Sequence, residues 1–472
     1  MVKEIIGREQ EQEDLGRLYD SDKSELIAVY GRRRIGKTFL IRNFYDDKIV
    51  FDISGMDGAK TPQLIKRFYT ELLKKYHPFG QMRKPKDWLD LFEWLKIYLD
   101  TLTQDEKKVI FIDEFPWFDT GRSGFLPVFE SFWNDYCTKR DDLVVVVCGS
   151  TASYMVKNII NNTGGLHNRI SKRLKIEPFN LNETKKFLAS KGIKFVQYDI
   201  LKIYMVLGGI PLYLEQVQKG DSIVTLINRI CFEKGAILQD EYKVVFKSLF
   251  GKSKLHENVI HKLANAEKKG LTRSNLLNLL GIDSGGPFTD ALEDLIMSGF
   301  IEKYNHHSGK SQELLYRIID EFCLFHIKFM KSHKGNSWEQ LHKTKDYETW
   351  CGTAFELICL KHTNHIKKGL GRKDVISDNY GWRNTKAQID LVIDRADNVV
   401  NLCELKYYKD VYNFNNKDFL DLTRRADEFA TTTNTQKNIH TVMITTHGIT
   451  ENQHSDKVVT KSLTMDCLFE KL

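Results

Sequence analysis

Gly31-Arg32-Arg33-Arg34-Ile35-Gly36-Lys37-Thr38 (GRRRIGKT) is the stretch that decides the fold of the N-terminal part. It fits G-x-x-x-x-G-K-[ST] at every position. The residues before it, Glu25 to Tyr30 (ELIAVY), are typical of a buried strand, and Thr38 to Tyr45 are helical in character. A glycine-containing turn between strand and helix directs backbone N–H groups and a helix N-terminus at an anion. The sequence therefore predicts a phosphate-binding loop.

Five positions of this loop are candidate cofactor-binding residues. Gly31 and Gly36 let the backbone wrap a phosphate without Cβ clashes, and Arg34 lies between them. Lys37 is expected to reach the β- and γ-phosphates of ATP, and the Thr38 hydroxyl to ligate Mg²⁺. ATP and Mg²⁺ are therefore the predicted cofactors.

A strand that ends in two acids follows downstream, Val109-Ile110-Phe111-Ile112-Asp113-Glu114. This is the Walker B arrangement, in which Asp113 would hold Mg²⁺ through water and Glu114 would polarise the attacking water. A base beside the γ-phosphate is needed only for hydrolysis, so the pair favours an ATP hydrolase over a protein that only binds ATP.

Two more polar positions are candidates beside the nucleotide. The apolar run Leu143 to Cys148 ends at Gly149-Ser150-Thr151, and Ser150 or Thr151 would sense the γ-phosphate or, equally, cap the next helix. Arg169 follows a glycine pair and would act as an arginine finger, in cis or for a neighbouring subunit, or remain a solvated surface arginine.

The wider pattern predicts an α/β layered domain with a parallel sheet. Lys48 to Ile53, Lys108 to Ile112 and Leu143 to Cys148 read as strands buried on both faces, and Trp88 to Leu102 has helical spacing.

After Pro178 the pattern changes. Asn182 to Phe250 is predicted to be helical, with a break at Gly208-Gly209-Ile210-Pro211. Leu255 to Tyr316 has the size and order of a winged helix. Its predicted helices and wing strands are His256 to Glu267, Thr272 to Leu280, Phe288 to Met297, Phe300 to Tyr304 and Leu314 to Ile318, with His306 to Gly309 between the strands.

This winged helix would bind DNA or pack one domain against another. Arg273 offers a base-reading group, and Lys268 and Lys269 would touch phosphates. Lys331 to Asn336 is polar and is predicted to be a linker. The predicted parts are a P-loop core (1–178), a helical lid (179–250), a winged helix with connector (251–335) and a last α/β domain (336–472).

The first half resembles the archaeal-type ATPases, within the AAA+ and signal-transduction NTPase assemblage, from about Val2 to Lys219. The segments that carry the resemblance are Ile6-Gly7-Arg8-Glu9, the phosphate-binding loop, Ile112-Asp113-Glu114, Cys148-Gly149-Ser150 and Gly208-Gly209-Ile210-Pro211. The resemblance implies that Arg8 lies near the nucleotide base. It also implies that Gly209 and Pro211 lie in a helical lid close to the adenine.

A second group of acids lies near the C-terminus. Asp390 falls in the strand-like Gln388 to Ile393, and Asn398 to Lys406 ends in Glu404-Leu405-Lys406. Residues two apart on a strand share a face, so Glu404 and Lys406 should point the same way. Two carboxylates suit a hard cation such as Mg²⁺, and the lysine would position or deprotonate a water.

These residues resemble the PD-(D/E)xK nuclease superfamily, which has the restriction-endonuclease-like α/β fold. The resemblance implies that Asp390 and Glu404 are metal ligands, that Lys406 is the catalytic lysine and that Glu356 is an acid from a nearby helix. Ile389, not proline, precedes Asp390. The segments Trp350 to Glu356 and Cys403 to Tyr407 also resemble a nuclease-like tail of unassigned function often fused to archaeal-type ATPases. Lys361 to Lys373 would contact phosphates or form a solvated helix end.

Composition restricts these readings only slightly. The chain has 70 Lys and Arg residues and 63 Asp and Glu residues, which gives a net charge of +7. This charge permits nucleic-acid binding but does not argue for it. The eight cysteines form no CxxC pair and read as buried thiols. Met1 to Gln10 is charged, and Leu143 to Cys148 is too short to span a bilayer. A cytoplasmic protein with no membrane partner is expected.

Three functions remain open on these residues. The first is an ATPase whose nucleotide state controls a metal-dependent nuclease-like domain acting on DNA. The second is a signalling or scaffold ATPase whose C-terminal domain only binds nucleic acid or protein. The third is a transcription regulator that uses the winged helix. DNA and further copies of the chain are the candidate macromolecular partners.

Overall fold

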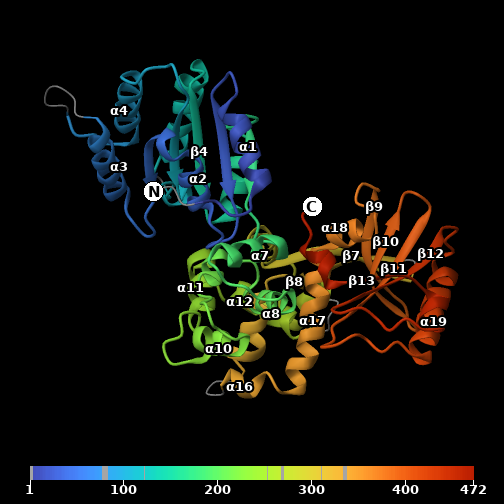
Figure 1. Ribbon diagram of the computed structural model, residues 1–472. Coiled ribbons are helices and arrows are strands. Elements are labelled where there is room, and N and C mark those ends of the chain that lie inside the picture. The colour runs from blue at the N-terminus through green and yellow to red at the C-terminus, as the bar shows by residue number, and fades with distance from the viewer. Residues whose placement is uncertain are drawn as a thin grey trace. The chain divides into compact units, whose positions relative to one another are not determined.

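The computed structural model describes seven stretches, namely residues 4–76, 83–121, 123–251, 253–266, 270–309, 311–332 and 337–472. The chain divides into two compact units, Met1–Pro178 and Phe179–Leu472, drawn in Figure 1 in blue to teal and in green to red. The predicted phosphate contacts Lys268 and Lys269, and residues 333–336 of the predicted linker, lie outside the described residues.

The first unit contains a five-stranded parallel sheet with strand order β2-β3-β4-β1-β5. This confirms the predicted α/β fold with a parallel sheet. The strands are β1 (Glu25–Tyr30), β2 (Ile49–Ser54), β3 (Lys108–Asp113), β4 (Leu143–Gly149) and β5 (Lys172–Lys175). The helices are α1 (Glu9–Tyr19), α2 (Lys37–Tyr45), α3 (Thr61–Lys75), α4 (Trp88–Asp100), α5 (Phe125–Ser131) and α6 (Ala152–Tyr154).

The strand order determines which loops meet at the carboxyl edge of the sheet. β4 lies between β1 and β3, so the segment after β4 falls between the phosphate-binding loop and the acids that end β3. Every residue of β3 and β4 is buried, which explains why their sequences do not alternate between apolar and polar.

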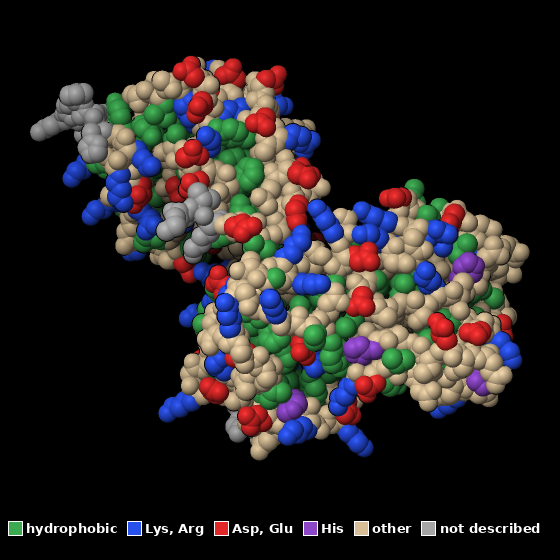
Figure 2. Space-filling model, in the orientation of Figure 1, with side chains coloured by type: hydrophobic (Ala, Val, Ile, Leu, Met, Phe, Trp, Pro, Cys, Tyr) green, Lys and Arg blue, Asp and Glu red, His purple; other side chains and the backbone are tan. Residues whose placement is uncertain are grey.

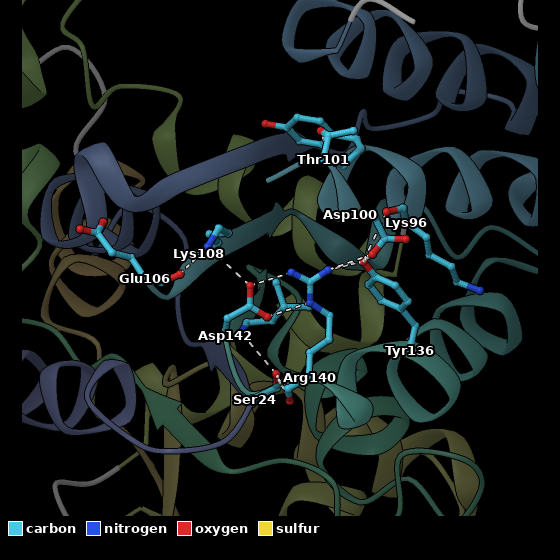
Figure 3. A network of polar contacts seen from close by, with 11 residues as sticks. Ser24, Lys96, Asp100, Thr101, Glu106, Lys108, Tyr136, Arg140 and Asp142 are labelled. Atoms are coloured by element: carbon cyan, nitrogen blue, oxygen red, sulfur yellow. Dashed lines mark hydrogen bonds and ion pairs between the residues drawn. The ribbon is translucent and has the colours of Figure 1, made fainter. Parts of the chain in front are cut away.

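A polar network lies at the opposite, amino edge of this sheet, beside the start of β4 (Figure 3). Arg140 donates to both carboxylate oxygens of Asp142 at 2.7 and 2.6 Å and to Asp100 at 3.0 Å, and the ammonium of Lys108 lies 3.5 Å from Asp142. Burial raises the pKa of Asp142, but the bonds and charge of Arg140 outweigh it, so the pKa is lowered. The network holds the N-terminal ends of β3 and β4 in place, at the edge opposite the carboxyl edge.

The second unit begins with short helices, as predicted for residues 182–250. They are α7 (Leu181–Ser190), α8 (Gln197–Leu207), α9 (Pro211–Leu214), α10 (Ile223–Ile227) and α11 (Glu241–Phe250). Gly208 ends α8 with a positive φ of 62°. A Cβ on Gly209 would lie 1.8 Å from the carbonyl oxygen of Phe179. Gly208 is therefore favoured by its positive φ, and Gly209 is required by close backbone packing.

Three helices and a hairpin follow in the order predicted for a winged helix. They are α12 (Lys254–Ala264), α13 (Arg273–Leu280), α14 (Gly286–Met297), β6 (Leu271–Thr272), β7 (Ile301–Ser308) and β8 (Ser311–Ile318). The prediction that His306 to Gly309 separate the strands was wrong, because His306 to Ser308 are part of β7 and pair with β8 and β9.

This hairpin belongs to an eight-stranded sheet with the order β13-β12-β11-β10-β9-β7-β8-β6. β7 pairs in parallel with β9, with His306 opposite Gly381. A Cβ on Gly381 would lie 2.9 Å from the His306 ring, so this approach needs glycine. The sheet continues across the boundary predicted after residue 335.

The remaining elements complete this sheet and its helices. They are α15 (Glu321–Phe325), α16 (Trp338–Leu341), α17 (Lys345–Lys361), α18 (Thr363–Gly369), β9 (Ser377–Arg383), β10 (Gln388–Arg395), β11 (Val399–Lys406), α19 (Asn416–Thr433), β12 (Asn438–Thr445), α20 (Ser455–Val458) and β13 (Val459–Thr464). Glu404 of β11 contacts Arg425 of α19, whereas the neighbouring Cys403 lies near Cys359 of α17. Adjacent strand residues face opposite ways, so α17 and α19 cover opposite faces.

All eight cysteines are buried free thiols, as expected. Within the described stretches, the structure contains no helix with both the length and the apolar character needed to cross a membrane.

Candidate nucleotide site and a second acidic site

The backbone of the phosphate-binding loop has a conformation that depends on glycine. Gly31 has a φ of 140°, and a Cβ there would lie 2.3 Å from the carbonyl oxygen of Ile176. Gly36 has a φ of 87° and caps the N-terminus of α2, and Arg34 also has a positive φ of 72°. Only glycine adopts the first two conformations without strain. The loop therefore has the open backbone that a phosphate requires.

Lys37 is held inside this loop. Lys37 is only 6% exposed, and its ammonium donates to the carbonyls of Gly31 at 3.0 Å and Arg32 at 2.9 Å. Burial lowers the pKa of Lys37. A buried cation whose ammonium bonds backbone carbonyls has lost much of its hydration, so an anionic phosphate suits this position.

Thr38 and Asp113 meet across the sheet edge. The Thr38 hydroxyl donates to Oδ2 of Asp113 at 2.9 Å, and the Ser54 hydroxyl lies 3.4 Å from the same oxygen. This pair of hard oxygen donors, a hydroxyl from α2 and a carboxylate from β3, fits Mg²⁺.

Glu114 occupies a strained position directly after β3. Its φ of 45° is left-handed, which costs energy for a residue with a Cβ. Oε2 accepts hydrogen bonds from the Ser150 hydroxyl at 2.7 Å and the Ser150 backbone N–H at 3.2 Å. Thr151 caps α6 without a side-chain hydrogen bond. Ser150 therefore orients the Glu114 carboxylate, and neither hydroxyl acts as a helix cap.

Arg8 and Arg169 have different surroundings. Arg8 is buried, and its guanidinium donates to the carbonyl of Ile35 in the loop at 3.3 Å and pairs with Glu11 at 3.4 Å. Arg8 thus braces the phosphate-binding loop. Arg169 is exposed. Pro211 is the first residue of α9 in the second unit. Gly209 packs closely against Phe179, and this packing alone explains why a glycine is needed there.

The C-terminal acids gather at the end of β11. The Lys406 ammonium lies 3.2 Å from Oε1 of Glu404, so the two side chains do share a face. Oδ2 of Asp390 accepts a hydrogen bond from the backbone N–H of Leu405 at 3.2 Å. The three predicted residues therefore meet within one short stretch of two adjacent strands.

Arg425 completes this second site, and sequence reasoning missed it. Its guanidinium donates to Oε2 of Glu404 at 2.7 Å and pairs with Asp421 at 2.6 Å. The contact depends on how α19 packs on β11, and the sequence carries no local signal for it. Both oxygens of Glu404 therefore face a cation.

Glu356 is buried on α17, on the opposite face from α19. The prediction that Glu356, Asp390 and Glu404 aim at one metal ion stays a prediction. Over the described part of the chain, no group of three or more His, Cys, Asp or Glu side chains is placed to hold a metal. Asp390 and Glu404 by themselves offer two carboxylates.

Surface charge gives neither unit a single sign. On the face shown in Figure 2, Lys and Arg side chains alternate with Asp and Glu side chains over both units. This agrees with the modest net charge of +7 and limits what bulk electrostatics contributes to binding nucleic acid.

The fold and the site of the first unit together define a P-loop NTPase. Comparison with known families narrows this class, because residues 5–217 match the model of an "ATPase domain predominantly from Archaea". The chain thus carries an archaeal-type ATPase domain.

Individual known proteins are also similar to this chain. An uncharacterised protein of Methanocaldococcus jannaschii is 25% identical over 372 residues, covering 77% of this chain and 78% of the relative. An uncharacterised ATP-binding protein of the same organism is 46% identical over 44 residues, covering 9% of this chain and 75% of the relative. A solved structure of a Walker-type ATPase of Pyrococcus abyssi matches with a TM-score of 0.50 and 17% identity, covering 69% of this chain and 96% of that one. At this sequence identity, the structural match shows only that the two proteins share a fold.

Proposed function

We propose that this chain hydrolyses ATP at the carboxyl edge of the first sheet. The observation that carries the proposal is the pair of contacts Thr38–Asp113 and Ser150–Glu114, which bring a cation-binding pair and an oriented carboxylate to one edge beside a phosphate-binding loop. A loop that only bound nucleotide would not need a strained, oriented Glu114.

Each residue has a defined task in this proposal. The loop N–H groups and Lys37 bind the phosphates, and Thr38 and Asp113 would hold Mg²⁺, which supplies charge neutralisation on the phosphate oxygens. Glu114 accepts a proton from, or orients, the attacking water, and Ser150 fixes the direction of its carboxylate. Arg8 keeps the loop in shape. Exposed Arg169 remains a proposed finger for the same or a neighbouring copy.

The test separates binding from hydrolysis. Glu114→Gln should retain ATP binding but lose hydrolysis by roughly 100-fold or more, since it keeps the shape and removes the base. Lys37→Ala should lose binding itself. Fluorescent-nucleotide binding and phosphate release report the two steps, and Lys461→Ala, an exposed lysine on β13, is the control. Full hydrolysis by Glu114→Gln would exclude the proposed role.

A second proposal concerns the C-terminal site. We infer that it is nuclease-like and acts on DNA under control of the nucleotide state. It is supported by the convergence of Asp390, Glu404 and Lys406 at one strand end, where Lys406 can position or deprotonate a water. The Arg425–Glu404 ion pair competes with a divalent cation for this carboxylate. That competition favours the alternative, a signalling or scaffold ATPase whose C-terminal domain only binds.

A cleavage assay decides between the two. Plasmid and single-stranded DNA are incubated with Mg²⁺ or Mn²⁺, with and without ATP. If the site cleaves, Lys406→Ala should lower the rate by about 100-fold or more, while Lys461→Ala on the same sheet cleaves as the parent. Lys37→Ala shows whether ATP controls the reaction. If the parent cleaves neither DNA, the binding-only alternative stands.

A further inference from the structure

A large cavity in the second unit is used by neither site described so far. Its volume is about 900 Å³, and α8, α10, α16, α17 and the segment after β11 surround it; these helices are labelled in Figure 1. Such a volume suits an organic ligand of nucleotide size. Six aromatic residues line it, namely Tyr198, Trp338, Tyr347, Tyr407, Tyr408 and Tyr412.

The aromatic rings are arranged by contacts among themselves. The Tyr198 and Tyr407 rings stack at 5.9 Å with 18° between their planes, and their hydroxyls lie 2.7 Å apart. The Tyr408 ring packs against the Tyr412 ring, with 4.6 Å between the ring centroids. Tyr408 is 46% exposed. Tyr408 therefore presents an accessible aromatic surface at the cavity mouth.

Charged groups of both signs surround this aromatic lining. Lys202 lies 4.2 Å from the centre of the Tyr198 ring, and Lys409 also lines the cavity. Glu348 and Asp410 are exposed lining residues. Carboxylates accept hydrogen bonds from the exocyclic amino groups of bases, and lysines attract phosphates. Rings, carboxylates and lysines in one cavity are what an unpaired base with its phosphate requires.

The cavity also adjoins the second acidic site. The Lys406 ammonium lies 5.5 Å from the centre of the Tyr412 ring, and Tyr407 and Tyr408 directly follow Lys406 in the chain. A base in the cavity would place its own backbone phosphate near Lys406. A base stacked within a duplex could not enter.

We propose that this cavity binds an unpaired base of single-stranded nucleic acid, with Tyr408 as the stacking surface. The proposal names a substrate class for the C-terminal site and in that respect rests on the second proposed function. Base binding itself needs no metal and no cleavage, so the two can be tested apart.

The experiment measures fluorescence anisotropy of a labelled oligo(dC) with the full-length chain in EDTA. Tyr408→Ala should weaken binding by about 5- to 150-fold, the loss expected for one stacked base. Tyr408→Phe keeps the ring and should bind as the parent. Leu420→Ala, which removes an exposed side chain of α19 that does not line the cavity, is the matched control.

The outcomes separate the two proposals. Weaker binding by Tyr408→Ala, together with no cleavage in Mg²⁺ by the parent, supports the base site and removes the nuclease. Cleavage by the parent with unchanged binding by Tyr408→Ala overturns the base site and keeps the nuclease. Absence of oligo(dC) binding by the parent also overturns the base site and leaves a peptide as the class of occupant to test.

Discussion

Glu114 and Ser150 illustrate how single residues build the nucleotide site. The backbone of Glu114 is left-handed, and two hydrogen bonds from Ser150 hold its carboxylate. Bonds to a charged acceptor are among the stronger ones in proteins. In the proposed hydrolysis, Ser150 would act on the water through Glu114, as a positioning residue.

Replacing Ser150 by Ala should therefore reduce kcat more than it raises KM. The lost hydroxyl bond is worth about 1.5–3 kcal/mol, which corresponds to at most about a 10- to 150-fold fall in kcat. Steady-state phosphate release at varied ATP measures both constants. Ser150→Thr, which keeps a hydroxyl, should recover most of the rate, and Lys461→Ala serves as the control. A rise in KM with normal kcat would contradict the positioning role.

At the scale of elements, a histidine joins α7 to the region between α17 and α18. Nδ1 of His362 donates to the carbonyl of Ile358 at 2.8 Å, so Nε2 is left to accept from the Leu181 N–H at 3.4 Å. Burial lowers the pKa of His362 to about 3 and that of nearby His365 to about 4. Protonated His362 could not accept the Leu181 bond.

The second unit should therefore lose stability as pH falls from about 6.5 toward 3. In that window the unfolded chain binds protons that folded His362 does not, so the free energy of unfolding falls by about 1.4 kcal/mol per pH unit for this residue. Urea unfolding at several pH values measures the slope. His362→Gln should flatten it, and His454→Gln, which replaces a half-buried histidine, should not. Equal slopes in all three chains would rule out this linkage.

On the scale of the whole molecule, the second unit joins parts that look separate along the chain. The pairing of β7 with β9 makes the hairpin and the C-terminal strands one sheet, and helices from the predicted lid share its compact unit. Trp382 of β9 is fully buried, and its indole N–H donates to the Gly309 carbonyl at the hairpin tip. One cooperative unit is therefore expected over residues 179–472.

Calorimetry of the full chain should show two unfolding transitions. Trp382→Ala should lower the free energy of unfolding of the second unit by about 3–5 kcal/mol. Phe68→Ala, which opens the core of the first unit, should lower the free energy of unfolding of that unit by a similar amount. A third transition, or a shift of both by either variant, would mean that the cooperative units differ from the two compact units.

Local sequence was sufficient for the phosphate-binding loop, for Asp113 and Glu114, and for the pairing of Glu404 with Lys406. Each of these depends on a few consecutive residues whose backbone geometry follows from glycine, a strand end or a two-residue period. The buried parallel strands also followed from their unbroken apolar runs. The tertiary structure alone decided the Ser150–Glu114 bond, the Arg425–Glu404 ion pair, the β7–β9 pairing and the aromatic cavity. These contacts join residues that are distant in the chain, and packing of whole elements, not local propensity, selects them.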